Sequence, residues 1–122
     1  MTALVACGAI ALLGGAGALA RFGLDAFVAT RWRGELPAGT LVVNLSGSMA
    51  LGVLVGLGPS TDAMRLAGTA LLGSYTTFST WMFETERAGE AGETGVAVAN
   101  VVLSLVLGVA CAALGRAIGE AL

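Results

Sequence analysis

Residues 73–81 read GSYTTFSTW and interrupt an otherwise apolar part of the chain. Six of these nine residues carry a hydroxyl group. Consecutive β-branched residues beside a glycine weaken an α-helix, and hydroxyl groups can bond to the backbone groups that a helix break leaves free. We therefore predict a break within a helix at this point. The alternative is a straight helix whose Ser and Thr side chains bond to carbonyl groups four residues earlier.

The composition around this stretch is that of a membrane protein. The chain has 122 residues, of which 57% are hydrophobic and 11% are charged, whereas a soluble domain has about 25% charged residues. A membrane helix needs about 20 consecutive apolar residues. Four stretches without any charge approach or exceed that length, at 1–20, 36–61, 66–83 and 94–115.

We therefore predict an all-α integral membrane protein with four transmembrane helices, of which the third is broken. The whole chain, 1–122, is expected to form a single domain with short loops. The expected spans are approximately 3–29, 38–58, 64–83 and 95–117.

The charged and reactive residues exclude several function classes. The formal net charge is −2, all six cations are arginines and histidine is absent, so His-based catalysis and His metal sites are ruled out. There is no basic excess for contacts with nucleic-acid phosphates. No nucleophile and base pair can be assembled, so we do not expect an enzyme. Cys7 and Cys111 lie in apolar stretches, where we expect small packing residues.

Two spans carry residues at a spacing of four, which places them along one helix face. The small residues of each series are expected to pack against other helices. A carboxamide in hydrocarbon must find a partner or face water, so Asn44 is expected either to face a cavity or to bond to another helix. The two series are Asn44, Ser48, Gly52 and Gly56, and Asn100, Ser104, Gly108 and Ala112.

The polar groups of the spans favour a small anion as the transported species. No acidic or basic residue lies centrally in any span, and Glu84 only borders the third. Amide, hydroxyl and aromatic groups suit an ion that accepts hydrogen bonds and touches positive ring edges. A cation would instead require rings of carbonyl or acidic groups.

Four short helices leave little room for a pore, so function is expected to need an oligomer. Arg31, Arg33 and Arg87 fall on one side of the membrane, and Arg65 and Arg116 on the other. This bias is too small to fix an orientation. A chain that inserts both ways is expected to form antiparallel dimers with dual topology.

Three segments carry a resemblance to a known family. They are GAGALAR at 15–21, GTLVVN at 39–44, and Gly73, Thr76, Thr77, Phe78, Ser79 and Thr80, with Glu84 following. At these residues the sequence resembles the small bacterial fluoride channels called Fluc or CrcB. The resemblance implies four spans, a broken third helix and an antiparallel dimer with two pores. It also implies passive, electrogenic export of fluoride across the bacterial inner membrane.

The resemblance also implies a role for individual residues. The backbone carbonyls of Gly73 and Thr76 would bind a structural Na⁺ at the dimer interface. Arg21 and Glu84 would be the charged residues at the entrances. Trp81 stands where the family usually has a second Phe, and Asn100 where it often has Tyr. The pore and fluoride residues would be Asn44, Phe78, Trp81, Thr77, Ser79, Thr80, Asn100 and Ser104.

Two alternatives remain open. The chain can be one subunit of an obligate heterodimer with a paralogue, in which it contributes only part of each pore. It can also be a small multidrug antiporter of four spans. Such an antiporter needs a carboxylate buried in the first span, and Asp25 lies near the end of that span.

Overall fold

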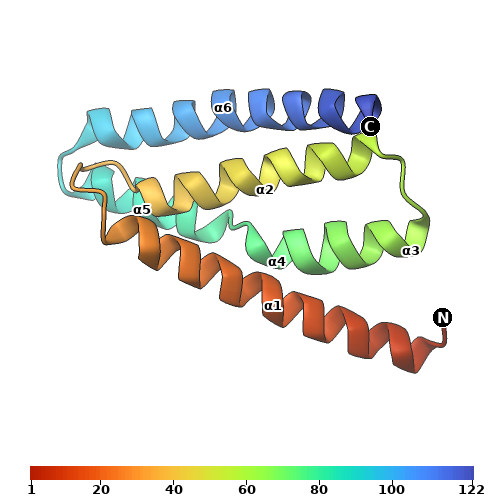
Figure 1. The fold of residues 1–122 in the computed structure, drawn as a ribbon. Coiled ribbons are helices and arrows are strands. Elements are labelled where there is room, and N and C mark those ends of the chain that lie inside the picture. The colour runs from red at the N-terminus through yellow and green to blue at the C-terminus, as the bar shows by residue number, and fades with distance from the viewer.

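The computed structural model describes residues 1–122 and is entirely helical. Its three long helices are α1 (Ala3–Ala29), α2 (Ala38–Gly56) and α6 (Thr94–Ala121), and between α2 and α6 the chain forms shorter helical segments (Figure 1). These segments are α3 (Thr61–Ala63), the π-helical η1 (Met64–Leu72), α4 (Gly73–Tyr75) and α5 (Ser79–Glu90).

By length and composition, α1, α2 and α6 are the three helices able to cross a membrane. Only 13 of the 122 residues are buried, so the fold leaves most of its apolar side chains uncovered. Leu19, for example, is 74% exposed on α1 and Val109 is 70% exposed on α6. An apolar surface of this extent requires lipid or another protein to cover it. The chain is therefore a membrane protein.

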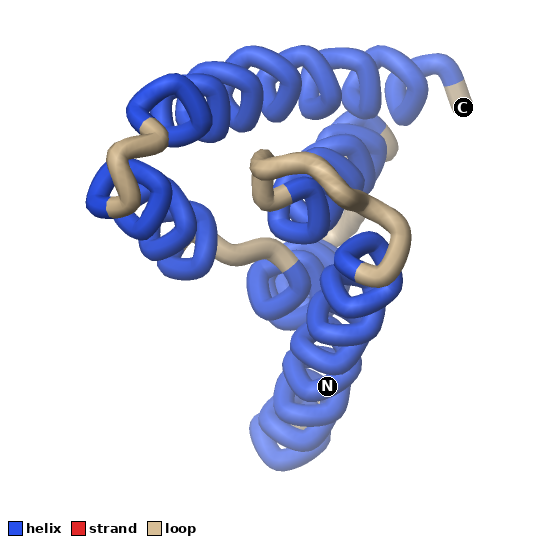
Figure 2. The backbone as a smooth tube through the Cα atoms, turned by 90° about the vertical axis from the view of Figure 1, so that its left-hand side faces the viewer, coloured by secondary structure: helices blue, strands red, loops and turns tan.

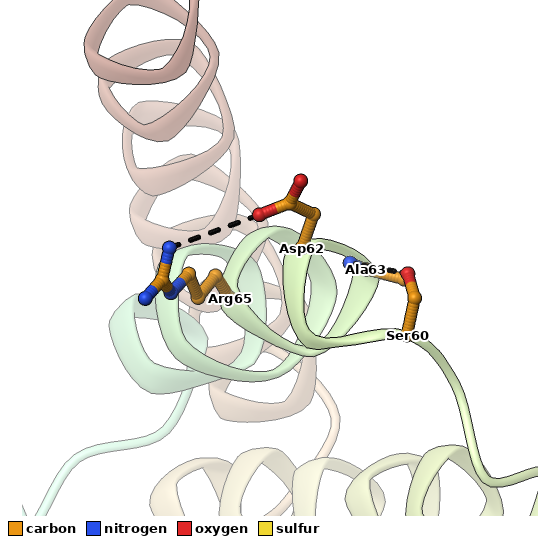
Figure 3. Close-up of polar contacts among 4 residues, drawn as sticks. All are labelled: Ser60, Asp62, Ala63 and Arg65. Atoms are coloured by element: carbon orange, nitrogen blue, oxygen red, sulfur yellow. Dashed lines mark hydrogen bonds and ion pairs between the residues drawn. The ribbon is translucent and has the colours of Figure 1, made fainter. Parts of the chain in front are cut away.

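Successive segments of the chain run in alternating directions. The connections at 30–37 and 91–93 lie at one end of the molecule, and both termini lie with the connection at 57–60 at the other (Figure 1). At this second end, Ser60 caps α3 because its Oγ accepts a hydrogen bond of 3.3 Å from the backbone N–H of Ala63 (Figure 3). The neighbouring Asp62 and Arg65 form an exposed ion pair of 3.7 Å.

Helices α2 and α6 pack closely because glycines line their contact. A Cβ atom added to Gly52 would collide with the carbonyl of Ala112, and one added to Gly115 would collide with the carbonyl of Met49. Gly56 and Gly119 are equally confined. The prediction that Gly52 and Gly56 form a packing face is confirmed. The face of α6 that meets them contains Gly115 and Gly119, which the sequence did not single out, and Ala112, which it expected to pack.

Helix α1 packs on the opposite side of the molecule. Figure 2 shows α1 and α6 well apart, with the other helices between them, and the two helices do not contact each other. Gly17 of α1 lies against the Leu71 carbonyl and the Ser74 hydroxyl, so a Cβ atom there has no space. This contact joins α1 to the helical segment that ends at Tyr75.

Candidate functional site

The backbone leaves helical geometry between Tyr75 and Ser79. Thr76 is extended, with φ −79° and ψ 160°, and α5 begins at Ser79. Both helix ends lie within the hydroxyl-rich stretch 73–81. At such an interruption, backbone groups lose their helical partners and need others.

The side chain of Asn44 supplies two of these partners. Its Oδ1 accepts a hydrogen bond of 2.8 Å from the backbone N–H of Thr77, and its Nδ2 donates one of 2.8 Å to the Thr77 carbonyl. Because the Thr77 N–H is turned to Asn44, it does not donate to the carbonyl of Gly73. The amide of α2 thus holds the extended segment in place.

The Thr76 carbonyl is also released from helical bonding. The backbone N–H of Thr80 donates to Thr77 Oγ1 at 3.2 Å instead of to Thr76. The Nη1 atom of Arg21 approaches the Thr76 carbonyl at 3.5 Å. The carbonyl groups of Gly73 and Thr76 are therefore free of backbone donors.

A groove of about 290 Å³ lies beside this interruption. It brings together six of the residues to which the resemblance assigned a role, and no charged side chain lines it. Phe78 is 70% exposed and meets Trp81 edge to face, with ring centroids 5.6 Å apart and an interplanar angle of 83°. The lining residues are Asn44, Gly47, Ser48, Leu51, Gly68, Leu72, Gly73, Thr76, Thr77, Phe78 and Trp81.

Asn100 lies behind Trp81 and does not line the groove. It is 2% exposed, and its Nδ2 donates to Thr85 Oγ1 at 2.8 Å and to the Trp81 carbonyl at 3.5 Å. The indole Nε1 of Trp81 donates to the Asn100 carbonyl at 3.1 Å. Sequence reasoning missed Thr85, although its place four residues after Trp81 puts it on the same face of a helix.

The remaining predicted pore residues lie outside the groove. Thr77 Oγ1 donates to Thr80 Oγ1 at 3.1 Å and lies 3.4 Å from Ser79 Oγ. Ser104 is half-buried on α6 and its side chain makes no hydrogen bond within the chain. The structure thus brings Asn44, Phe78 and Trp81 together and leaves Ser79 and Ser104 apart from them.

Arg21 and Thr80 line a second cavity, of about 200 Å³, on the other side of Thr77. Asp25 and Thr40 complete its polar lining. Thr40 belongs to the GTLVVN segment at 39–44, and the sequence predicted no separate role for it. Its hydroxyl connects this cavity to Glu84.

Glu84 lies just beyond the expected third span, 64–83. Its Oε1 accepts a hydrogen bond of 2.6 Å from Thr40 Oγ1, and its Oε2 is buried without a partner. Burial raises the pKa of this carboxyl group, and the hydrogen bond from Thr40 offsets the rise only in part. A cavity of about 330 Å³ near the 30–37 connection is lined by Glu84 together with Asp25 and Glu35.

The chain is similar to known proteins along most of its length. The chain is 50% identical over 120 residues to a protein of Mycolicibacterium paratuberculosis named fluoride-specific ion channel FluC 2, with 98% of each chain covered. A FluC 2 protein of Mycobacterium tuberculosis is 50% identical over 111 residues, which cover 91% of this chain and 88% of that protein. A fluoride-specific ion channel FluC 1 of Rubrobacter xylanophilus is 42% identical over 106 residues, 86% of each chain.

The family described as CrcB-like protein, Camphor Resistance (CrcB), matches residues 8–116. This match covers most of the chain, including all residues of the groove and of the helix interruption. The resemblance noted in the sequence is therefore confirmed, and the chain belongs to the CrcB-like family.

Proposed function

We infer that this chain is a fluoride-selective ion channel and not an enzyme. The observation that carries this function is the uncharged groove in which Asn44, Phe78 and Trp81 meet beside two carbonyl groups that have no backbone donor. The relatives named as fluoride-specific ion channels supply the identity of the ion. Family membership also favours a channel over a small multidrug antiporter.

The groove suits a small anion for chemical reasons. Aromatic ring edges carry partial positive charge, and the exposed Phe78 ring is free to present its edge. A site without fixed charge binds an anion weakly enough for it to leave again, which conduction requires. Transport is then passive and electrogenic, because the chain offers no acidic residue in the groove to carry a counter-proton.

We place four crossings in the membrane. Helices α1, α2 and α6 make three of them, and the broken run of η1, α4 and the start of α5 makes the third crossing along the chain, at 64–83. The extensive exposed apolar surface and the nearly balanced arginines at the two ends support an antiparallel dimer with dual topology and two pores. Because the relatives are bacterial proteins named as ion channels, we propose the bacterial inner membrane as the location of this dimer.

The two carbonyl groups without a backbone donor fit a structural Na⁺ at the dimer interface. A hard cation such as Na⁺ is suited by oxygen ligands, and the Gly73 and Thr76 carbonyls have no backbone donor. Arg21 touches only one of the two, at the long distance of 3.5 Å. Gly73 and Thr76 of each subunit would hold the ion, which would fix the two interruptions against each other without an acidic ligand.

The pore residues then have graded roles. Phe78 and Trp81 contact the anion, and Asn44 and Thr77 shape the groove around it. The hydroxyl groups of Ser79, Thr80 and Ser104 extend the polar path beyond the groove. Arg21 and Glu84 lie at the entrances, on the cavities beyond Thr77.

Fluoride efflux from liposomes that contain only the purified protein tests the function. Valinomycin and K⁺ carry the countercharge, and chloride-loaded liposomes are the control. Rapid efflux of fluoride without efflux of chloride is the expected result. Absence of fluoride efflux from folded protein, with or without a co-reconstituted paralogue, would contradict it.

An obligate heterodimer is the second candidate. The relatives bear the names FluC 1 and FluC 2, which is consistent with paired paralogues. In that case the purified chain alone conducts no fluoride, and efflux appears only after reconstitution with a FluC 1 paralogue from the same genome. Efflux from the chain alone excludes this candidate.

A further inference from the structure

Trp81 and Asn100 are joined by hydrogen bonds in both directions between α5 and α6. The indole N–H of Trp81 donates to the backbone carbonyl of Asn100 at 3.1 Å, and the side-chain amide of Asn100 donates to the backbone carbonyl of Trp81 at 3.5 Å. The same amide donates to Thr85 Oγ1 at 2.8 Å, and Thr85 in turn donates to the Trp81 carbonyl at 2.8 Å. The indole ring and the backbone carbonyl of Trp81 are thus both hydrogen-bonded to Asn100.

Trp81 also lines the groove. Trp81 lies edge to face with Phe78, at 5.6 Å between ring centroids. The N–H is the only hydrogen-bond donor of an indole ring, and here the Asn100 carbonyl occupies it. The ring therefore borders the groove with its polar donor withdrawn toward α6.

We propose that the Asn100 side chain is a positioning group for Trp81: its amide fixes α5 against α6, so that the ring stays beside Phe78 and the indole N–H reaches the backbone carbonyl of residue 100, away from the permeating anion. This inference rests on the proposed fluoride channel. Asn100 itself is 2% exposed and separated from the groove, so it acts through Trp81 and not as a ligand. Trp81 and Asn100, the two residues that depart from the usual family pattern, therefore act together.

The hydrogen bond of the Trp81 indole N–H affects conduction. An ion must be bound weakly enough to leave the pore, and a hydrogen bond from N–H to an anion is roughly twice as strong as one between neutral groups. A free indole N–H would hold fluoride and slow its exit. With the N–H bound to the backbone carbonyl of Asn100, Phe78 and Trp81 offer the anion only C–H ring edges.

Fluoride efflux from liposomes measures the positioning role. Loss of the Asn100 amide bonds in Asn100→Ala is expected to lower the efflux rate by about two- to tenfold, the range that corresponds to one net hydrogen bond. Val102→Ala, at a half-exposed position two residues along α6, is the matched control and should conduct normally. In the Trp81→Phe background, which has no indole N–H, Asn100→Ala should lower the rate less. Equal losses in the two backgrounds would contradict the proposal.

The indole N–H resonance provides a readout that a merely structural role would not change. In ¹⁵N-labelled protein in detergent micelles, Trp32→Phe assigns the two indole signals, and the signal of the half-exposed Trp32 serves as internal control. Fluoride is expected to leave the Trp81 signal unmoved in the unsubstituted protein. It should shift the signal in Asn100→Ala, where the backbone acceptor at position 100 remains but the amide no longer holds Trp81 against it. A fluoride-dependent shift in the unsubstituted protein would overturn the proposal.

The two failures can be told apart. Absence of fluoride efflux from the unsubstituted protein, alone and with a paralogue, overturns the proposed function. A fluoride-sensitive Trp81 signal in a protein that conducts overturns only the positioning role. The titration of the unsubstituted protein also decides the matter where Asn100→Ala fails to fold.

Discussion

The side chain of Asn44 forms a two-bond amide pair with the backbone of Thr77, both bonds at 2.8 Å. It replaces the helical hydrogen bonds that Thr77 would otherwise make, and so stabilises the extended backbone at the start of the groove. A carboxamide can do this because it carries a donor and an acceptor side by side. Asn44 therefore couples the shape of α2 to the interruption between Tyr75 and Ser79.

Substitution of Asn44 by Asp is expected to abolish or strongly reduce fluoride efflux. The carboxylate keeps the acceptor for the Thr77 N–H but leaves the Thr77 carbonyl without a donor, which costs about 1–3 kcal/mol. Its negative charge also repels the anion in the groove. Ser46→Asp, which places the same charge at an exposed position of α2 outside the groove, is the control. An unchanged efflux rate at neutral pH in Asn44→Asp would place Asn44 off the pathway.

Substitution of Phe78 by Ile should remove fluoride efflux and preserve the fold. Phe78 is 70% exposed, so the loss of its ring exposes little new surface, whereas the positive ring edge that faces the anion disappears. Efflux assays and size-exclusion chromatography measure the two effects separately. Phe83→Ile on the same helix, at a residue that is 59% exposed and outside the groove, should conduct normally. Full flux in Phe78→Ile would refute a ligand role for the ring.

The helical architecture is largely readable from the sequence, because it depends on local properties. Charge-free stretches predicted α1, α2 and α6, and the hydroxyl-rich stretch contains the points where α4 ends and α5 begins. The spacing of Gly52 and Gly56 likewise predicted a packing face. Each of these features depends only on consecutive residues or on residues one helical turn apart.

The details of the site are less readable because they depend on contacts between distant residues. Nothing in the spacing of Asn44 shows that Thr77, 33 residues later, uses both ends of its amide. Asn100 and Trp81 were each predicted as pore residues, but only the packing of α5 on α6 shows that one binds the other. The glycine face of α6 was missed because Gly115 and Gly119 lie at the charged end of the span, near Arg116.

The contact between α2 and α6 predicts opposite effects of two glycine substitutions on α6. Gly115→Ala places a methyl group against the Met49 carbonyl, which forces the helices apart and should cost about 1–3 kcal/mol of stability. In Gly108→Ala the added carbon lies 4.0 Å from Ser48 Oγ, an ordinary contact, so stability should be unchanged or slightly higher. Denaturation in detergent micelles compares the two. Equal stabilities would show that the close approach of the helices is not needed.

Glu84 predicts a pH dependence of stability. Burial raises the pKa of its carboxyl group above the ordinary value of 4.5, so the folded protein retains this proton at pH values where the unfolded chain has lost it. The free energy of unfolding should therefore fall as the pH rises from about 4.5 through the raised pKa, and level off above it. Glu84→Gln keeps an oxygen that accepts the Thr40 hydrogen bond and removes the titration, so this decline should disappear. Glu90→Gln, at an exposed residue of the same helix, should retain it. Denaturation curves between pH 4 and 8 measure the slopes, and parallel slopes for the unsubstituted protein and Glu84→Gln would show that another group is responsible.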